Sequence, residues 1–373
     1  MLLGKVLLLA VTIGAFDLAA PAAAGAPQRT ISPLARVART LVRDGAPGAL
    51  VVVRTPTGIR RAASGLASRE PRVALRATDR FRVASITKPF VATLVLQLVA
   101  EGKLRLDESV DRWLPGLVPN GGAITIRELL NHTSGLFEYQ GDEAFVSAVI
   151  ADPGREWSPR ELVRIATAHA PLFPPATGWS YSNTNYVLLG LVVEAVTGKT
   201  IDQQLRERIF DSLALAATSF PAGTGIEGKH AQGYIGFATL PSLPFGTLMD
   251  VTSVVSPSIG WAAGGIVSNG DDVTRFFAAL LGGRLLRPDL LAAMRTVASG
   301  SQYGLGLMRV QTACGRVFGH LGDGPGYRTV AYASPNGRRV VVVMVNIDAT
   351  YVSWSQLEAA AESAFCSRRV SQH

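Results

Sequence analysis

RVASITKPFVATLVLQLVAE, the stretch Arg82–Glu101, joins a polar Ser-x-x-Lys step to an apolar run. From Phe90 to Ala100 only Thr93 and Gln97 are polar, a composition typical of a helix that is buried on nearly every side. The apolar run is too short to span a bilayer. We therefore predict a central core helix around which the rest of the chain packs.

Ser85 and Lys88 lie at the start of this predicted helix, three residues apart. If the segment is helical from about Ser85 onward, the two side chains share one face and the Lys88 amine reaches the Ser85 hydroxyl. An ammonium group at the mouth of a packed helix must be paired, hydrogen-bonded or partly deprotonated. The helix N-terminus also favours an anion beside Ser85. The alternative is a serine N-cap followed by a solvated lysine.

Lysine is scarce in this chain, which gives Lys88 more weight. The chain uses arginine for most of its positive charge, and its five lysines are Lys5, Lys88, Lys103, Lys199 and Lys229. Of these, Lys88 alone follows a serine by three residues. Arginine cannot exchange a proton near neutral pH, so Lys88 is a candidate for proton transfer.

The first residues have the pattern of a secretory signal peptide. Lys5 precedes an apolar core at residues 6–16, and Ala22–Ala24 offers a small-residue cleavage site. We therefore expect residues 1–24 to be a leader and residues 25–373 to form one secreted, extracytoplasmic catalytic unit. The remaining sequence has no run long enough for a transmembrane helix.

Composition narrows the classes of function. The formal net charge is +8, but the arginines are scattered along the chain rather than gathered in a patch, which argues against nucleic-acid binding. Cys314 and Cys366 predict a single disulfide in an exported chain, worth roughly 4 kcal/mol in the chain-entropy model. Histidines do not stand at zinc-ligand spacing from these cysteines, so we expect no metal and no cofactor.

Apolar periodicity and turn residues predict the secondary structure. We expect helices at residues 31–44, 126–130, 159–169, 183–196, 201–213, 270–281, 287–297 and 353–365. We expect strands at residues 48–55, 59–66, 304–310, 316–319, 327–334 and 338–346. This order favours an α/β (α+β) fold, in which an antiparallel sheet built from both ends of the chain is flanked by helices. We place the α/β part at about residues 30–84 and 250–373, and an all-helical insertion at about residues 85–249.

Two further segments carry polar side chains that suit chemistry. Tyr181–Asn183 stands just before a predicted helix, where Ser182 or Asn183 is also a natural N-cap. His320 follows a predicted strand within the glycine-rich stretch Phe318–Gly324. Glycines there let a substrate approach the strand, and the imidazole can tune a neighbouring hydroxyl, although such a histidine is often structural.

The other histidines carry less weight. His132, within Asn131–Gly135, is interpreted as a hydrogen-bonded turn residue rather than a catalyst. His169 and His230 have no recognisable catalytic neighbours in the sequence. The chain has no Gly-x-Ser-x-Gly motif, which argues against an α/β-hydrolase.

The order and spacing of these motifs resemble those of the penicillin-recognising serine hydrolases. Ser85–Lys88, Tyr181–Asn183 and His320–Gly322 look like the three motifs of that family. The similarity covers nearly the whole mature chain and is closest to the secreted D-alanyl-D-alanine carboxypeptidases and the class C β-lactamases. The carboxypeptidases carry a cysteine pair that looks placed like Cys314 and Cys366. The segments that carry the resemblance are VASITKPF, LDESVDRWLPG, IRELLNHTSGL, YSNTNYVLLG, GWAAGGIVS, YGLGL, FGHLGDGPGY and ESAFC.

The resemblance implies a reaction through an acyl-enzyme. Ser85 would attack a carbonyl, and Lys88 and Tyr181 would share the removal of its proton, with the identity of the base left open. Asn183 would hold the amide side chain of the substrate. The backbone N–H groups of Ser85 and Asp323 would form the oxyanion hole.

The chain departs from the carboxypeptidase pattern where those enzymes hold the terminal carboxylate of their substrate. Leu321, Asp323 and Met308 stand where the carboxypeptidases have two hydroxyl residues and an arginine. An uncompensated Asp323 would repel a substrate carboxylate in a dry cleft. Strand alternation is expected to point the next residue, Arg309, to the opposite face.

We therefore expect a serine hydrolase of the carboxypeptidase and β-lactamase type that acts on ester or amide carbonyls. Because carboxylate recognition is weakened, an esterase or a D-amino-acid amidase or peptidase on the same scaffold is an alternative. A non-catalytic cell-envelope binding module is an alternative of another class, although Ser85, Lys88, Tyr181 and His320 are all present. The expected partner is a small-molecule or peptide substrate, with cell-wall peptidoglycan as one candidate, and we expect a monomer.

Overall fold

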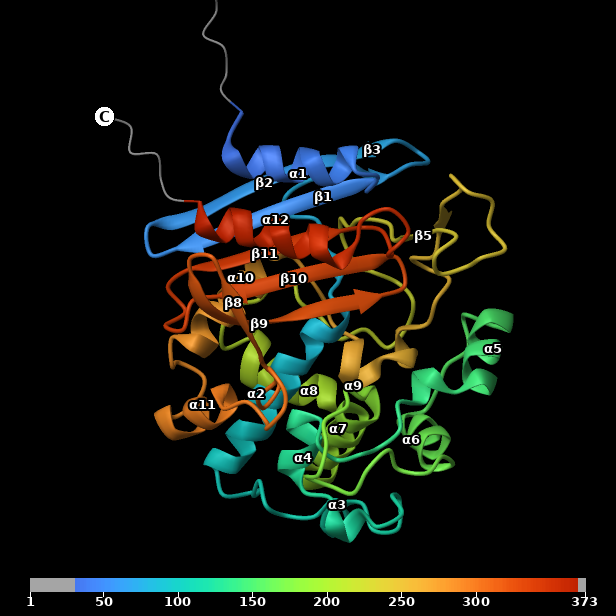
Figure 1. The fold of residues 1–373 in the computed structure, drawn as a ribbon, viewed down its shortest axis with the longest axis vertical. Coiled ribbons are helices and arrows are strands. Elements are labelled where there is room, and N and C mark those ends of the chain that lie inside the picture. Colours follow the sequence, from blue (N-terminus) through green and yellow to red (C-terminus); the bar gives the residue numbers. More distant parts are fainter. Residues whose placement is uncertain (1–30, 368–373) are drawn as a thin grey trace, which may run out of the picture. The chain divides into compact units, whose positions relative to one another are not determined.

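A seven-stranded sheet is assembled from both ends of the chain and lies in the upper part of Figure 1. The computed structural model describes residues 31–367, so the expected leader at residues 1–24 lies outside the described residues. Neighbouring strands pair antiparallel in the order β3-β2-β1-β11-β10-β9-β8. The strands are β1 (Gly48–Thr55), β2 (Gly58–Ser68), β3 (Val73–Ala74), β8 (Met308–Thr312), β9 (Gly315–Gly324), β10 (Tyr327–Ala333) and β11 (Val340–Val345).

Helices cover both faces of this sheet, which explains why the residues of its central strands are almost all buried. The residues of β11 are all buried, and β1 is buried from Gly48 to Val53. α1 (Pro33–Arg43) and α12 (Trp354–Cys366) pack together on one face (Figure 1). α10 (Gly270–Leu281) packs on the other face, where a Cβ on Gly270 would lie 2.5 Å from a Val52 methyl group.

The predicted central helix is present and buried. A 3₁₀ turn, η1 (Ala84–Ile86), leads into α2 (Thr87–Ala100), whose residues from Thr87 to Leu96 are all buried. Ser85 therefore lies in the 3₁₀ turn and Lys88 in the first turn of the α-helix. This geometry places the two side chains on one side of the chain, as the sequence predicts.

The remaining helices surround α2 on the side away from the sheet. They are α3 (Val110–Trp113), α4 (Ile126–Asn131), α5 (Glu143–Ala151), α6 (Pro159–Thr167), α7 (Asn183–Thr197), α8 (Ile201–Leu205), α9 (Trp261–Gly264) and α11 (Pro288–Arg295). One hydrophobic cluster joins these helices to the inner face of the sheet. The division into an α/β part and a helical insertion stays a prediction. Within residues 31–367, the structure contains no helix that combines the length and apolarity needed to cross a membrane.

The fold confirms the predicted α/β class with an antiparallel sheet, and two strand predictions need correction. The strand expected at residues 304–310 begins at Met308, because Gly306 adopts a φ of +81° in a turn. The strand expected to end at Gly319 continues to Gly324, where it pairs with β10. His320 therefore lies within β9 rather than after its end.

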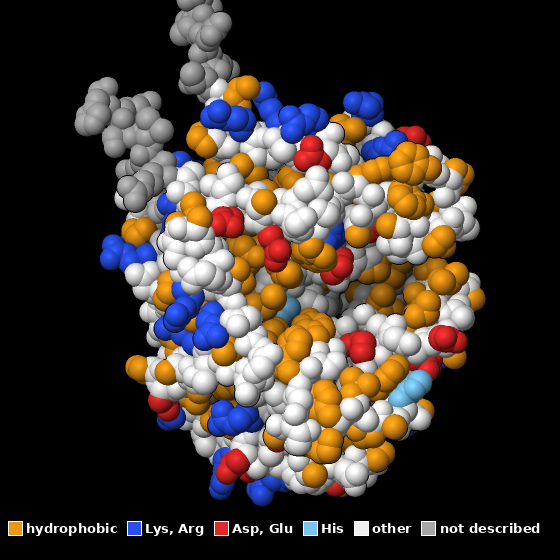
Figure 2. Space-filling view, viewed as in Figure 1, with side chains coloured by type: hydrophobic (Ala, Val, Ile, Leu, Met, Phe, Trp, Pro, Cys, Tyr) orange, Lys and Arg blue, Asp and Glu red, His pale blue; other side chains and the backbone are white. Residues whose placement is uncertain are grey.

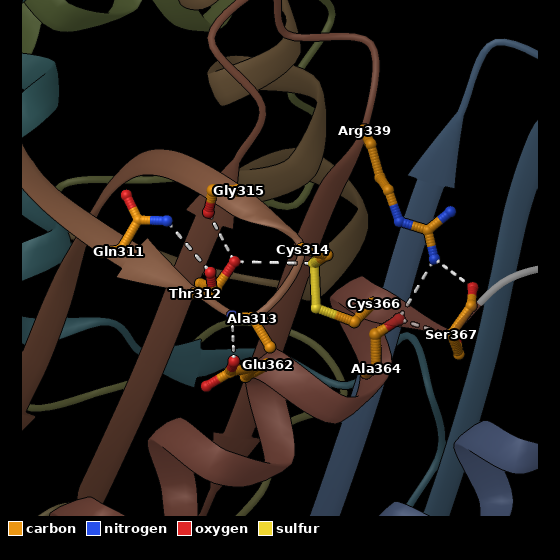
Figure 3. Close-up of a disulfide and its surroundings, with 10 residues drawn as sticks. All are labelled: Gln311, Thr312, Ala313, Cys314, Gly315, Arg339, Glu362, Ala364, Cys366 and Ser367. Carbon is orange, nitrogen blue, oxygen red and sulfur yellow. Dashed lines mark hydrogen bonds between the residues drawn. A yellow bond between two sulfur atoms is a disulfide. The ribbon is translucent and has the colours of Figure 1, made fainter.

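The predicted disulfide joins Cys314 to Cys366, with their Cα atoms 5.6 Å apart. Figure 3 shows that it fastens the turn between β8 and β9 to the end of α12. A hydrogen bond from the Ala313 N–H to Glu362 Oε1 (2.5 Å) reinforces this attachment. Since β9 carries residues of the candidate site, the disulfide steadies one wall of that site.

Candidate active site

Ser85 lies in a cleft between strand β9, the neighbour of the edge strand β8, and the helices. The cleft has a volume of about 750 Å³, and most of its lining is apolar. Figure 2 shows a hollow with hydrophobic side chains on both of its rims. The cleft-lining residues that the sequence singled out are Ser85, Tyr181, Asn183, Met308, His320, Leu321 and Asp323. One cleft therefore gathers side chains that are distant in the sequence.

The backbone around Ser85 is held in an unusual conformation. Ala84 has a φ of +48°, a left-handed conformation that costs an L-residue about 1–2 kcal/mol. Strand β9 approaches this turn so closely that a Cβ on Gly322 would lie 2.3 Å from the Val83 carbonyl oxygen. Glycine at position 322 therefore lets the β9 backbone lie directly beside the nucleophile turn.

Lys88 makes three hydrogen bonds from a fully buried position. Its Nζ lies 2.9 Å from Ser85 Oγ, 2.6 Å from Asn183 Oδ1 and 2.9 Å from the Ala263 carbonyl oxygen. An ammonium group donates to all three oxygens. A neutral amine keeps two donors for Asn183 and Ala263 and turns its lone pair to the Ser85 hydroxyl. Both protonation states therefore fit the same geometry.

Burial lowers the pKa of Lys88 from 10.5 to about 7, and the Glu138 carboxylate opposes the shift. Burial in turn raises the pKa of Glu138, which accepts the backbone N–H groups of Asn183 and Gln140. Lys88 thus exchanges a proton near neutral pH. Glu138 was missed by the sequence analysis, since nothing in the chain marks a glutamate 50 residues downstream as a neighbour of Lys88.

Tyr181 completes the group around the serine. The Ser85 side chain interacts with the Tyr181 hydroxyl and opposes the rise in its pKa, and the Tyr181 ring centroid lies 4.8 Å from Lys88 Nζ. Burial raises the pKa of Tyr181 well above 10, so its phenol keeps its proton. Asn183 comes from the first residue of α7 and also donates to Gln140 Oε1 at 3.2 Å.

His320 lies near this group but bonds elsewhere. Its Nδ1 lies 2.5 Å from the Leu321 carbonyl oxygen, and its Nε2 lies 2.7 Å from the Tyr303 hydroxyl. Because a carbonyl oxygen only accepts, Nδ1 carries the proton and Nε2 accepts from Tyr303. Burial and the charge on Lys88 lower the pKa of His320 to about 3. The hydroxyl that His320 contacts is thus Tyr303, a residue that the sequence analysis did not single out.

The wall where carboxypeptidases hold a carboxylate has a different character here. Met308 and Leu321 line the cleft, and Arg309 turns to Gln302, with its Nε 3.0 Å from Gln302 Oε1. Asp323 is 56% exposed, and the nearest cation is the fully buried Arg328, whose Nε lies 3.7 Å from its carboxylate. The sequence-based description of Asp323 as uncompensated was therefore wrong.

An apolar wall on the other side of the cleft escaped the sequence analysis. Phe145, Val146, Val149 and Ile150 line it from α5, and Val251 and Val255 also line the cleft. Val146 and Ile150 are 42% and 60% exposed. The α5 segment, EAFVSAVIA, has the composition of a helix, and its Asp142 N-cap was the signal that could have found it. The cleft can accept a large apolar group.

The site combines a serine, Ser85, with a lysine one turn later, Lys88, and a tyrosine, Tyr181. This combination defines a serine hydrolase of the acyl-enzyme type. Residues 34–364 match the family model described as Beta-lactamase, and the chain belongs to this family. This match confirms the resemblance drawn from the three motifs and favours an enzyme over a non-catalytic binding module.

Solved structures and a curated relative agree with this assignment. A D-stereospecific amidohydrolase from Streptomyces sp. has 36% identity and a TM-score of 0.81, over 90% of this chain and 98% of the other. A D-amino acid amidase from Ochrobactrum anthropi SV3, complexed with L-phenylalanine amide, has 26% identity and a TM-score of 0.77, over 89% and 96%. A candidate penicillin-binding protein, PbpX of Bacillus subtilis (strain 168), is 27% identical over 325 residues, which are 86% of this chain and 75% of PbpX.

The lowered pKa of Lys88 predicts the pH dependence of acylation. Only the neutral amine can accept the Ser85 proton, so kcat/KM for an activated ester should rise with pH and level off above an apparent pKa of about 7. Steady-state rates between about pH 5 and 10.5 measure this limb. The exposed-lysine variant Lys199→Arg should keep it. A profile that rises only above about pH 9 would contradict the shifted pKa.

Proposed function

We propose that this chain is an exported serine hydrolase that releases acyl groups from esters and amides of D-amino acids through an acyl-enzyme on Ser85. The observation that carries the proposal is the buried Lys88 amine, 2.9 Å from Ser85 Oγ with a pKa of about 7. A serine hydroxyl gains a base at neutral pH from this arrangement. The cleft then supplies the selectivity.

The reaction begins when neutral Lys88 accepts the Ser85 proton as Oγ attacks the carbonyl carbon. Lys88 is favoured as this base over Tyr181, because burial holds the phenol in its protonated form. The Tyr181 hydroxyl can then pass its proton to the departing amine or alcohol and regain one from the Lys88 ammonium, which returns Lys88 to the neutral amine. The backbone N–H groups of Ser85 and Asp323 are assigned to the oxyanion, and water releases the acyl group by the reverse sequence.

The substrate class is inferred from the cleft and from the neighbours. Met308 and Leu321 offer no charge to a terminal carboxylate, and Arg309 is held by Gln302. Esters and amides therefore suit this wall better than the free carboxylate of a D-alanyl-D-alanine peptide. The similarity to a D-stereospecific amidohydrolase from Streptomyces and a D-amino acid amidase from Ochrobactrum supports amides with D-stereochemistry.

Carboxypeptidase activity on peptidoglycan remains the second candidate, and the family membership supports it. Amidated peptidoglycan stems fit the cleft better than stems that end in a free carboxylate. Export is supported by the leader pattern of residues 1–24. We also propose a monomeric enzyme, since Ser85, Lys88 and Asn183 already meet within one chain.

Covalent trapping tests the proposed nucleophile. Incubation with a penicillin and with an activated D-phenylalanine ester should each add one acyl mass to the protein, since both present a reactive carbonyl to Ser85. Intact-mass spectrometry detects the adduct, and its decay reports deacylation. The Ser85→Ala variant should gain no mass from either reagent. An equal adduct on this variant would overturn the assignment.

Restoring the carboxypeptidase residues should shift selectivity toward free carboxylates. In the triple variant Met308→Arg, Leu321→Thr, Asp323→Thr, we expect the kcat/KM of an acyl-D-Ala-D-Ala peptide to rise about tenfold relative to its C-terminal amide, or ~1.4 kcal/mol. The ratio of the two substrates is measured on one enzyme preparation, so partial loss of folded protein cancels. Arg309→Ala is the matched control and should leave the ratio unchanged. An unchanged ratio in the triple variant would remove the basis for the ester and amide preference.

A further inference from the structure

His132 lies against the catalytic tyrosine, and the proposed reaction does not use it. It follows α4 with a φ of +65°, a left-handed conformation in which asparagine or glycine is more usual. Its side chain is fully buried. Histidine is one of the non-glycine residues that adopt this conformation most often, so the contacts of the imidazole decide what it does.

The contacts of His132 surround Tyr181 in the chain. Its carbonyl oxygen accepts the Ser180 N–H at 3.1 Å, and its Nδ1 accepts the Ser182 N–H at 3.2 Å. Its ring centroid lies 4.4 Å from that of Tyr181, with the planes 35° apart. One residue therefore holds the backbone on both sides of Tyr181 and also packs against its ring.

The hydrogen bonds define the protonation of His132. Ser134 donates to Asn185 Oδ1 at 2.6 Å, which turns the Asn185 amide N–H toward His132 Nδ1 at 3.0 Å. With two donors directed at Nδ1, this nitrogen carries the lone pair and the proton is on Nε2. Within residues 31–367, the His132 Nε2 has no hydrogen-bond partner.

The charges around His132 keep it neutral. Burial lowers its pKa well below 6.5, and Lys88 and His320 add to this because either would repel an imidazolium. The other titratable groups beside the ring are tyrosines 181, 186 and 303, whose pKa values burial raises. His132 therefore does not titrate where Lys88 does.

We propose that His132, as a neutral imidazole, is a positioning residue that holds the Tyr181 hydroxyl on Ser85 and the Tyr181 ring beside Lys88. The inference rests on the proposed function, in which Tyr181 relays a proton. His132 does not line the substrate cleft, and Tyr181 is one of many residues that do, so a small displacement of Tyr181 leaves most of the cleft lining in place. Loss of His132 should therefore reduce turnover rather than binding.

The main test replaces the ring and keeps its hydrogen bond. In His132→Asn, the amide oxygen can replace Nδ1 as acceptor, and asparagine tolerates a positive φ. We expect kcat for an activated D-amino-acid ester to fall about tenfold to a hundredfold with little change in KM. The acid limb should keep its apparent pKa, since the imidazole is neutral. A raised KM with unchanged kcat, or a shifted limb, would contradict the proposal.

A double-mutant cycle separates this inference from the proposed function. Tyr181→Phe alone should lower kcat, and adding His132→Asn to it should cause little further loss, because the hydroxyl to be positioned is gone. Additive losses would overturn the positioning role while leaving the proposed function intact. Full activity of Tyr181→Phe would instead contradict the proposed function itself.

Two further variants distinguish a loss of positioning from a general loss of folded protein. His132→Phe keeps an aromatic ring against Tyr181 but removes the acceptor of the Ser182 N–H, and should lower kcat in the same direction. His230→Asn, at an exposed histidine that bonds to the Gly228 carbonyl, is the matched control and should behave as wild type. Thermal unfolding of each variant shows whether the protein is folded. Wild-type kcat in folded His132→Asn and His132→Phe would overturn the proposal.

Discussion

A single buried amine determines how this site is built. Lys88 has no access to solvent, so every hydrogen bond that water would have made must come from the protein. Ser85, Asn183 and Ala263 supply these bonds from three different segments. The apolar helix α2 supplies the burial that lowers the pKa of Lys88. The same packing that forms the core thus also makes the lysine a base near neutral pH.

Two opposing effects set the protonation state of Lys88. Glu138 favours the ammonium form, whereas burial favours the free amine and leaves the pKa near 7. His320, which faces the same site, stays neutral and accepts a hydrogen bond from Tyr303. Its contribution to the site is therefore packing and polarity rather than charge. A second cation beside Lys88 would otherwise lower the pKa of Lys88 further.

The sequence predicted the central helix, the sheet built from both ends of the chain and the Ser85–Lys88 pair. Each of these depends on local patterns of apolar and polar residues. It also predicted that Arg309 turns away from the cleft, since strand alternation is a local rule. It could not predict the Arg328 partner of Asp323, the Tyr303 partner of His320 or the nearness of Glu138. These contacts depend on how distant segments meet, and on a β9 strand that continues past Gly319 where glycines suggested a loop.

The scarcity of lysine allows the central claim to be tested at the atom concerned. Beyond residue 24 the chain has four lysines, Lys88, Lys103, Lys199 and Lys229, so their ¹³Cε resonances can be followed individually in a pH titration. One resonance should titrate near pH 7, and it should be missing in Lys88→Met. If the Lys88 resonance titrated near the usual lysine value of about 10.4, Lys88 would be an ordinary ammonium group and the base assigned to Ser85 would not exist.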